Sequence, residues 1–169
     1  MDVVSLKVGV VYHEKFGQYD LGEDHPFRGD RFVNVMRFFE EQGLFRLPNV
    51  VVLKPEPVAR EDLLRVQDEA YVDLVFRLAE LSQPYDVETP VSPLILEAAR
   101  LMVGGALEAG KAVFDGRVDR AVALGCGYHH AGRDYGGGFC LLNDIAVLIE
   151  FLREKYGLKR FLVLDYDVH

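Results

Sequence analysis

Four short apolar runs stand out along the chain, at residues 7–12, 50–53, 121–124 and 161–164. Each is rich in valine, leucine or aromatic side chains and is too short to form a helix of ordinary length. Continuous apolar runs of this kind indicate strands that are buried on both faces, as in a parallel sheet. We therefore predict four buried strands, the last of which continues into Asp165.

Between these runs the apolar residues recur at intervals of three and four, which predicts amphipathic helices. Gly43 and Gly157 can each end one of these helices, and Ser92 can cap another that has Pro93 in its first turn. Small residues near Gly104 and Gly105 predict close packing of that helix against the sheet. The alternation of strands and helices predicts an α/β fold. The predicted helices cover residues 31–42, 59–81 with a break at 67–70, the stretch that follows residue 92, and 143–156.

The length of the chain and its composition, half of which is hydrophobic, predict a single domain that spans residues 1–169. No apolar run is long enough to span a membrane and no secretion signal is visible, so we expect a cytoplasmic protein. The two cysteines, Cys126 and Cys140, are too few for a disulfide framework. The net charge of −8, without a cluster of lysine or arginine, argues against direct binding of nucleic acid.

Polar residues follow two of the predicted strands, where ligands of open α/β sheets usually bind. The first set is a glycine-flanked turn that carries His129 and His130. The second set is Asp165, Asp167 and His169, whose alternate positions would place them on one face of an extended segment. Carboxylate and imidazole ligands suit Zn²⁺, although Fe²⁺, Co²⁺ or Mn²⁺ would also accept them.

Each set also has a simpler interpretation. Acidic residues commonly end a strand and cap the loop that follows, and adjacent histidines in a loop can be merely solvated. The placement of the histidine pair favours chemistry, because one imidazole can accept a proton from water while the other returns one to a leaving amine. Metal-assisted hydrolysis of an amide needs both steps.

Three motifs in the sequence resemble those of a known protein family. Gly-Tyr-His-His-Ala at residues 127–131, Gly-Phe-Cys-Leu-Leu-Asn-Asp at 138–144 and Asp-Tyr-Asp-Val-His at 165–169 resemble the histone deacetylase family in order and spacing. Weaker support comes from Tyr19-Asp20, from His25-Pro26 with Arg31, and from residues 68–71. Within the family, the prokaryotic acetoin-utilisation deacetylases are the most similar branch, with acetylpolyamine amidohydrolases as relatives. The resemblance implies a three-layer α/β/α fold with a mainly parallel sheet, as in the arginase/deacetylase superfamily.

The resemblance also implies a role for each matching residue. Asp167 and His169 would bind Zn²⁺, or Fe²⁺ or another divalent metal in its place. His129 and His130 would be the general acid and base, and Asp165 would orient His129 and help to hold a structural K⁺. The substrate would be an acetylated lysine of a protein or an acetylated small amine. Gly138 and Phe139 would line the tunnel for the substrate's stem, and Glu69 would hold the substrate's backbone at the rim.

Some positions depart from the family pattern. Many relatives have aspartate where this chain has Glu69, histidine where it has Gln67 and proline where it has Gly29, so the rim is the part least defined by resemblance. Cys126 and Cys140 flank the motifs without an evident base, and we read both as buried packing residues, with Cys140 behind the tunnel.

The match covers only the amino-terminal half of a deacetylase domain. The family's third metal ligand and its oxyanion-stabilising tyrosine lie beyond the matched segments, so we expect the chain alone to be nearly inactive. We also expect strands of the other half to lie between the third and fourth strands, so that a carboxyl-terminal half or self-association is needed to cover apolar edges. Two alternatives are a non-catalytic remnant or interaction module, and an arginase-like ureohydrolase with two Mn²⁺ ions.

Overall fold

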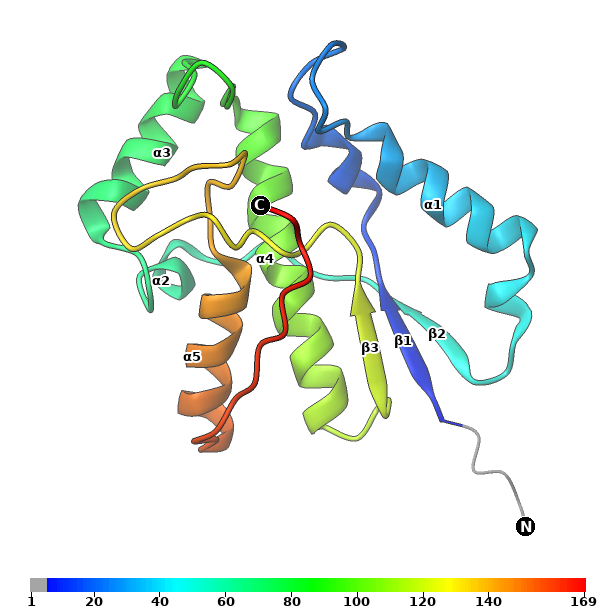
Figure 1. The fold of residues 1–169 in the computed structure, drawn as a ribbon. Helices are drawn as coiled ribbons and strands as arrows, with labels where there is room; N and C mark the ends of the chain where they lie inside the picture. The colour runs from blue at the N-terminus through cyan, green and yellow to red at the C-terminus, as the bar shows by residue number, and fades with distance from the viewer. Residues whose placement is uncertain (1–5) are drawn as a thin grey trace.

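The computed structural model describes residues 6–169, which form a parallel three-stranded sheet flanked by helices (Figure 1). The strands are β1 (Val8–Val11), β2 (Val50–Leu53) and β3 (Arg120–Ala123), and their order in the sheet is β2-β1-β3. Val10 of β1 stands in register with Val52 on one side and Val122 on the other. Three of the four predicted strands are therefore confirmed as strands, each end within one residue of the prediction. Only β1 is largely buried, so the prediction of burial on both faces was wrong for β2 and β3.

The predicted helices are also present. A single break, at residues 64–68, divides α2 from α3, close to the predicted position. The 3₁₀ helices η1 (Glu14–Gln18) and η2 (Leu44–Arg46) were not predicted, as is usual for such short elements. The α-helices are α1 (Asp30–Glu41), α2 (Arg60–Leu63), α3 (Glu69–Leu81), α4 (Pro93–Phe114) and α5 (Asp144–Tyr156).

The long helix α4 packs against the sheet, on the side opposite α1 (Figure 1). Its first turn is capped by the Ser92 side chain, which accepts a hydrogen bond from the backbone N–H of Ile95 at 3.2 Å. A Cβ atom at Gly105 would lie 3.7 Å from Val11 of β1, and one at Gly104 would lie 1.9 Å from the carbonyl oxygen of Glu56. The small residues therefore allow the predicted close approach to the sheet, and they also allow an approach to the 54–58 loop that was not predicted.

The hydrophobic core lies toward the carboxyl ends of the strands. It joins η1, α3 and α4 to the segment 128–142, and its largest fully buried side chains include Phe16, Tyr19, Leu101, Met102 and Leu141. Burial of side chains of this size supplies most of the favourable free energy of folding. The loops beyond the strand ends are consequently built directly on the core.

The fourth predicted strand is not formed. Residues 161–164 are extended but carry no sheet hydrogen bonds within the described chain, and Figure 1 shows this red segment beside α5 and apart from β3. Leu162 is 83% exposed and Leu164 is 65% exposed. A strand requires a hydrogen-bonding neighbour about 4.8 Å away, and residues 6–169 place none beside this segment. The prediction of a buried strand was wrong for the chain by itself.

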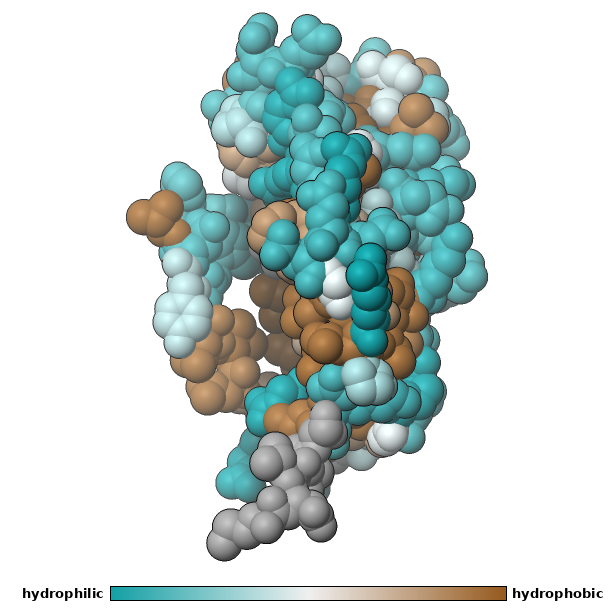
Figure 2. Space-filling model, turned by 90° about the vertical axis from the view of Figure 1, so that its right-hand side faces the viewer, coloured by the Kyte–Doolittle hydropathy of each residue, from teal (hydrophilic) through white to brown (hydrophobic). Residues whose placement is uncertain are grey.

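Apolar side chains are also exposed on the rest of the sheet. Val122 of β3 is 50% exposed and Val52 of β2 is 49% exposed. Figure 2 shows the side of the molecule that carries α1 and β2, where brown side chains gather around a hollow. Among the described residues, no helix is long and apolar enough to cross a membrane.

Candidate active site

The turn that follows β3 carries the histidine pair. Gly127 has φ +107°, a conformation that L side chains rarely adopt, and it lets the chain change direction just before Tyr128 and His129. The backbone N–H groups of Gly127 and Tyr128 donate to the carboxylate of Asp144, at 3.0 and 2.7 Å. The turn is thus tied to the first residue of α5.

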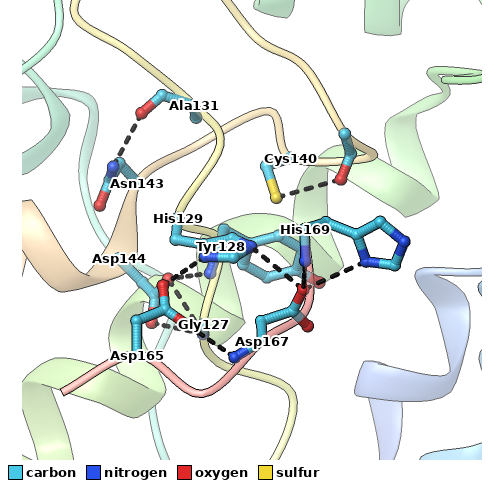
Figure 3. Close-up of polar contacts among 11 residues, drawn as sticks. Gly127, Tyr128, His129, Ala131, Cys140, Asn143, Asp144, Asp165, Asp167 and His169 are labelled. Atoms are coloured by element: carbon cyan, nitrogen blue, oxygen red, sulfur yellow. Dashed lines mark hydrogen bonds and ion pairs between the residues drawn. The ribbon is translucent and has the colours of Figure 1, made fainter.

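Asp144 is the buried anchor of this turn. Its side chain is 1% exposed, and burial raises the pKa of its carboxyl above the ordinary value, opposed by the backbone hydrogen bonds. Asn143, the capping residue of α5, donates from Nδ2 to the carbonyl oxygen of Ala131 at 2.7 Å. The start of α5 therefore holds the chain on both sides of the histidine pair, an arrangement shown in Figure 3.

The two imidazole rings lie next to each other, with ring centroids 4.3 Å apart and ring planes at 71°. Nδ1 of His129 is 2.5 Å from a carboxylate oxygen of Asp165, and Nε2 is 4.0 Å from Asp167 (Figure 3). An ionised carboxylate only accepts hydrogen bonds, so Nδ1 of His129 carries the hydrogen and a neutral ring keeps Nε2 free to accept a proton. This is the tautomer that a general base requires.

The carboxyl-terminal residues lie beside the histidine pair. The hydrogen bond from His129, followed by that from the backbone N–H of Asp167, lowers the pKa of the Asp165 carboxyl. The pKa of the Asp167 carboxyl is also lowered, chiefly by the backbone N–H of His169, which donates to it at 2.8 Å. Nδ1 of His169 lies 3.2 Å from the same oxygen. Both carboxylates are therefore ionised at neutral pH.

A tight hairpin carries the glycine-rich loop past His130. Gly137 and Cys140 exchange backbone hydrogen bonds of 3.0 and 2.8 Å, and the two residues between them, Gly138 and Phe139, have φ +49° and +69°. A Cβ atom at Gly138 would lie 2.5 Å from Cδ2 of His130. Only glycine lets the loop pack this closely on the imidazole ring.

These elements enclose a pocket of about 470 Å³. The structure brings six of the predicted site residues to its wall: His129, His130, Gly138, Phe139, Asp167 and His169. Asp165 does not line the pocket but contacts His129, as its predicted orienting role requires. The residues singled out by their position at strand ends and those added by the family resemblance therefore lie close together, although they come from three separate motifs.

Glu69 is the exception among the predicted site residues. It lies at the first turn of α3, its side chain is 73% exposed, and its carboxylate pairs with Arg60 of α2 at 3.1 Å. It is not part of the pocket wall. The Glu69 carboxylate is thus directed to Arg60, and its predicted contact with the substrate backbone at the rim stays a prediction.

The pocket wall also contains residues that were not predicted as site residues, among them Phe27, Arg31 and Cys126. The Arg31 guanidinium lies 3.7 Å from the centroid of the Phe27 ring. The segment from His25-Pro26 to Arg31 gave only weak support for the family, and its position in the sequence did not show that it reaches the pocket.

Both cysteines are free thiols, and burial raises the pKa of Cys140 to about 11 and that of Cys126 well above its usual value. Neither thiol is ionised at neutral pH, which agrees with packing roles.

Comparison with known proteins identifies the group to which this site belongs. Residues 25–169 match the histone deacetylase domain. The chain belongs to the histone deacetylase family. A probable deacetylase of Archaeoglobus fulgidus is 32% identical over 97% of this chain and 46% of its own length, and the acetoin utilization protein AcuC of Bacillus subtilis is 32% identical over 94% of this chain and 43% of its own length.

Solved structures of histone deacetylase relatives share the fold. The histone deacetylase homologue of Aquifex aeolicus has a TM-score of 0.77 and 27% sequence identity, over 88% of this chain and 42% of that protein. A structure of a histone deacetylase homologue complexed with SAHA gives the same values. The likeness supports the predicted arginase/deacetylase-like α/β fold. The chain spans less than half the length of the relatives that it matches.

Two residues of the pocket wall have side chains of the kind that bind divalent metals. Asp167 and His169 offer a carboxylate and an imidazole on the same pocket wall, a donor set suited to Zn²⁺. Within residues 6–169, no group of three histidine, cysteine, aspartate or glutamate side chains is placed to hold a metal ion. Catalytic zinc sites usually have three protein ligands, so Asp167 and His169 alone would not complete such a set.

Proposed function

We propose that this chain contributes the acid-base half of a metal-dependent deacetylase, which hydrolyses the amide of an acetylated lysine or a related acetylated amine. The observation that carries the proposal is the contact of 2.5 Å between Nδ1 of His129 and Asp165, on the wall of a pocket that Asp167 and His169 also line. An oriented imidazole, a neighbouring second imidazole and two metal-type ligands together favour hydrolysis over simple binding.

In this proposal the two histidines divide the proton transfers. His129, with Nδ1 bonded to Asp165, presents Nε2 toward Asp167 and can accept a proton from the attacking water. His130 lies against His129 and can donate a proton to the departing amine. Hydrolysis of an amide requires both events, because an amine leaves only after it is protonated.

Asp167 and His169 would hold the divalent metal, for which Zn²⁺ is the first expectation and Fe²⁺ the second. When bound, such a metal supplies Lewis-acid activation of the amide carbonyl and of water. A structural K⁺ at Asp165 remains part of the proposal. The carboxylates of Asp165 and Asp167 have lowered pKa values, which keeps both ionised and able to bind cations at neutral pH.

The pocket suits a narrow apolar chain that ends in a polar group. Phe139 and the backbone of Gly138 form part of its wall, and the histidine pair lies on the same wall. A lysine side chain has four methylene groups that an aromatic wall can desolvate. One histone deacetylase relative was solved with SAHA, so a relative's site accepts that ligand.

The proposed partner is the carboxyl-terminal half of a deacetylase domain. Two observations support it: β3 and the extended residues 161–164 expose apolar side chains, and the chain spans less than half of its relatives. Exposed apolar strands favour association with another chain. A third metal ligand would also have to come from outside residues 6–169.

Co-expression with the carboxyl-terminal half of a related deacetylase tests the proposal. We expect hydrolysis of an acetyl-lysine peptide that disappears on chelation of the metal and returns when Zn²⁺ is added. His130→Ala should lower kcat by about 10²-fold or more, the usual contribution of a general acid or base. Retention of full activity by His130→Ala would show that the proton-transfer pair is assigned wrongly.

A non-catalytic interaction module is the second candidate, because the side chains of Asp167 and His169 are 53% and 78% exposed in the chain alone. Stable, monomeric and metal-free folding without a partner, together with no turnover after co-expression, would favour it. The arginase-like alternative predicts two bound Mn²⁺ ions and hydrolysis of guanidinium substrates. The His129-His130 pair and the aromatic wall at Phe139 argue against it.

A further inference from the structure

Phe139 occupies an unfavourable position in the backbone. It is the second central residue of the two-residue turn between Gly137 and Cys140, and both central residues have positive φ, the pattern of a type I′ hairpin turn. The second position of such a turn is usually glycine, because a Cβ atom collides with the backbone in this region. A bulky residue with φ +69° persists only where its surroundings hold it.

The Phe139 ring is held from the pocket mouth. The His25 ring meets it edge to face, with centroids 4.5 Å apart and planes at 83°. The orientation of His25 is set in turn by the backbone N–H of Phe27, which donates to Nδ1 at 2.9 Å. This contact supports the ring but does not reach the strained backbone.

The backbone of Phe139 is held by Tyr19. The Tyr19 hydroxyl donates to the Phe139 carbonyl oxygen at 2.7 Å, although the two residues lie 120 positions apart. Tyr19 is fully buried and packs against Tyr128 and Phe27, with ring centroids 5.1 and 5.3 Å away. Its burial raises the pKa of the hydroxyl, so it remains a donor throughout the working pH range. The same ring therefore touches the turn that bears the histidines and the carbonyl of the pocket wall.

We propose that Tyr19 is a positioning residue for substrate binding: its hydroxyl fixes the strained Gly138-Phe139 turn so that the Phe139 ring is preset as a wall of the pocket. The substrate-binding part of this inference rests on the proposed function, whereas the mechanical part rests on the turn alone. A preset wall improves binding because the ordering of the loop does not have to occur when the substrate enters.

Amide hydrogen exchange tests the mechanical part without any catalytic assay. In the purified chain or its co-expressed assembly, Tyr19→Phe keeps the ring but removes the donor, and we expect the Gly137 and Cys140 amides to exchange about fivefold faster. Adding Phe139→Gly should restore slow exchange, because glycine adopts the turn without strain. Tyr71→Phe is the matched control, since it removes a buried hydroxyl that bonds to the neighbouring Leu141 carbonyl at 2.9 Å. Any increase in exchange caused by Tyr71→Phe should not be reversed by Phe139→Gly.

Unchanged exchange in Tyr19→Phe, or the absence of rescue by Phe139→Gly, would overturn the inference. Should Tyr19→Phe fail to fold, Phe139→Gly still tests the backbone strain on which the inference rests. Relief of strain then predicts exchange at Gly137 and Cys140 that is no faster than in the parent chain, and faster exchange would contradict it.

Kinetics of the co-expressed enzyme test the binding part. Tyr19→Phe should raise KM for an acetyl-lysine peptide about fivefold and change kcat less than about twofold, the effect of losing one neutral buried hydrogen bond. Phe139→Gly should raise KM by itself, and Tyr19→Phe should add nothing in that background. If Tyr19→Phe raised KM equally in the parent enzyme and in the Phe139→Gly variant, Tyr19 would be a general core residue and not a positioning residue. Absence of all turnover would count against the proposed function, while the exchange data would still decide the role of Tyr19.

Discussion

Nδ1 of His129 lies 2.5 Å from the carboxylate of Asp165, although the whole of α5 separates the two residues in the chain. His129 reaches this point from the turn after β3, and Asp165 reaches it from the extended segment after α5. Asp144 at the start of α5 holds the histidine turn from behind. The contact therefore depends on the helix and on both segments that flank it.

Replacing Asp165 with asparagine should remove the constraint that Asp165 places on the tautomer of His129. An amide can present its N–H₂ group to Nδ1 of His129 and favour the other tautomer, which leaves Nε2 unable to accept a proton. In the co-expressed enzyme we expect Asp165→Asn to lower kcat by about 10²-fold with little change in KM. Steady-state kinetics measure this, with Asp115→Asn at the far end of α4 as the control. A loss confined to KM would show that Asp165 does not act through His129.

Gly138→Ala should disable the site, because the new Cβ would lie 2.5 Å from the His130 ring and the residue has φ +49°. Either the loop or the imidazole must move, so we expect kcat to fall by at least about tenfold and the unfolding free energy by about 1–2 kcal/mol. Gly137→Ala is the matched control, since a Cβ there meets nothing within 4 Å. Chemical denaturation and kinetics would compare the two, and equal effects would contradict the packing argument.

Asp144→Asn should change how stability depends on pH. Burial raises the pKa of the Asp144 carboxyl in the folded protein, so the folded state holds this proton more tightly than the unfolded state does. The resulting stabilisation is present below the ordinary pKa of 3.8 and is lost as the pH rises through the folded-state value. Relative to the parent chain, Asp144→Asn should therefore gain stability as the pH rises from about 4 through the raised folded-state pKa. Urea unfolding across this range measures it, and the exposed Asp24→Asn serves as control; a difference that shrinks with rising pH would refute the burial effect.

Leu162→Asp should change the stability of the chain alone and that of its complex with a carboxyl-terminal half by different amounts. Leu162 is 83% exposed, so the substitution should change the unfolding free energy of the isolated chain by no more than about 0.5 kcal/mol. If residues 161–164 become a buried strand beside a carboxyl-terminal half, the same aspartate should destabilise the complex by about 3 kcal/mol. Val87→Asp, at a fully exposed loop position, should be neutral in both. Equal tolerance of Leu162→Asp in chain and complex would argue against strand burial there.

The success of the fold prediction can be traced to local signals. Apolar runs located β1, β2 and β3, and caps at Ser92, Asn143 and Gly157 marked helix ends that the structure confirms. These signals act within a few residues, so they can be read directly from the sequence. The run at 161–164 has the same composition, but a strand also needs a neighbour, which this chain does not provide within its described residues.

For the site, too, local signals in the sequence predicted some features and tertiary packing decided the others. Alternation placed Asp165, Asp167 and His169 together, and the motifs indicated His129, His130 and Phe139, all of which meet at or beside one pocket. The predicted rim residue Glu69 lies outside the pocket wall and pairs with Arg60. A residue's direction depends on how its helix packs, which the order of residues does not state.

The sequence by itself determined the family, the order of the elements and the residue types available for chemistry, because motif spacing and apolar periodicity are local properties. Only the tertiary structure decided which side chains support that chemistry: Asp144 beneath the histidine turn and Tyr19 at the carbonyl of Phe139. It also decided that residues 161–164 find no strand partner among residues 6–169 and stay largely exposed. The physical reason is that hydrogen bonding and burial join residues far apart in the chain, and their partners are chosen by packing in three dimensions.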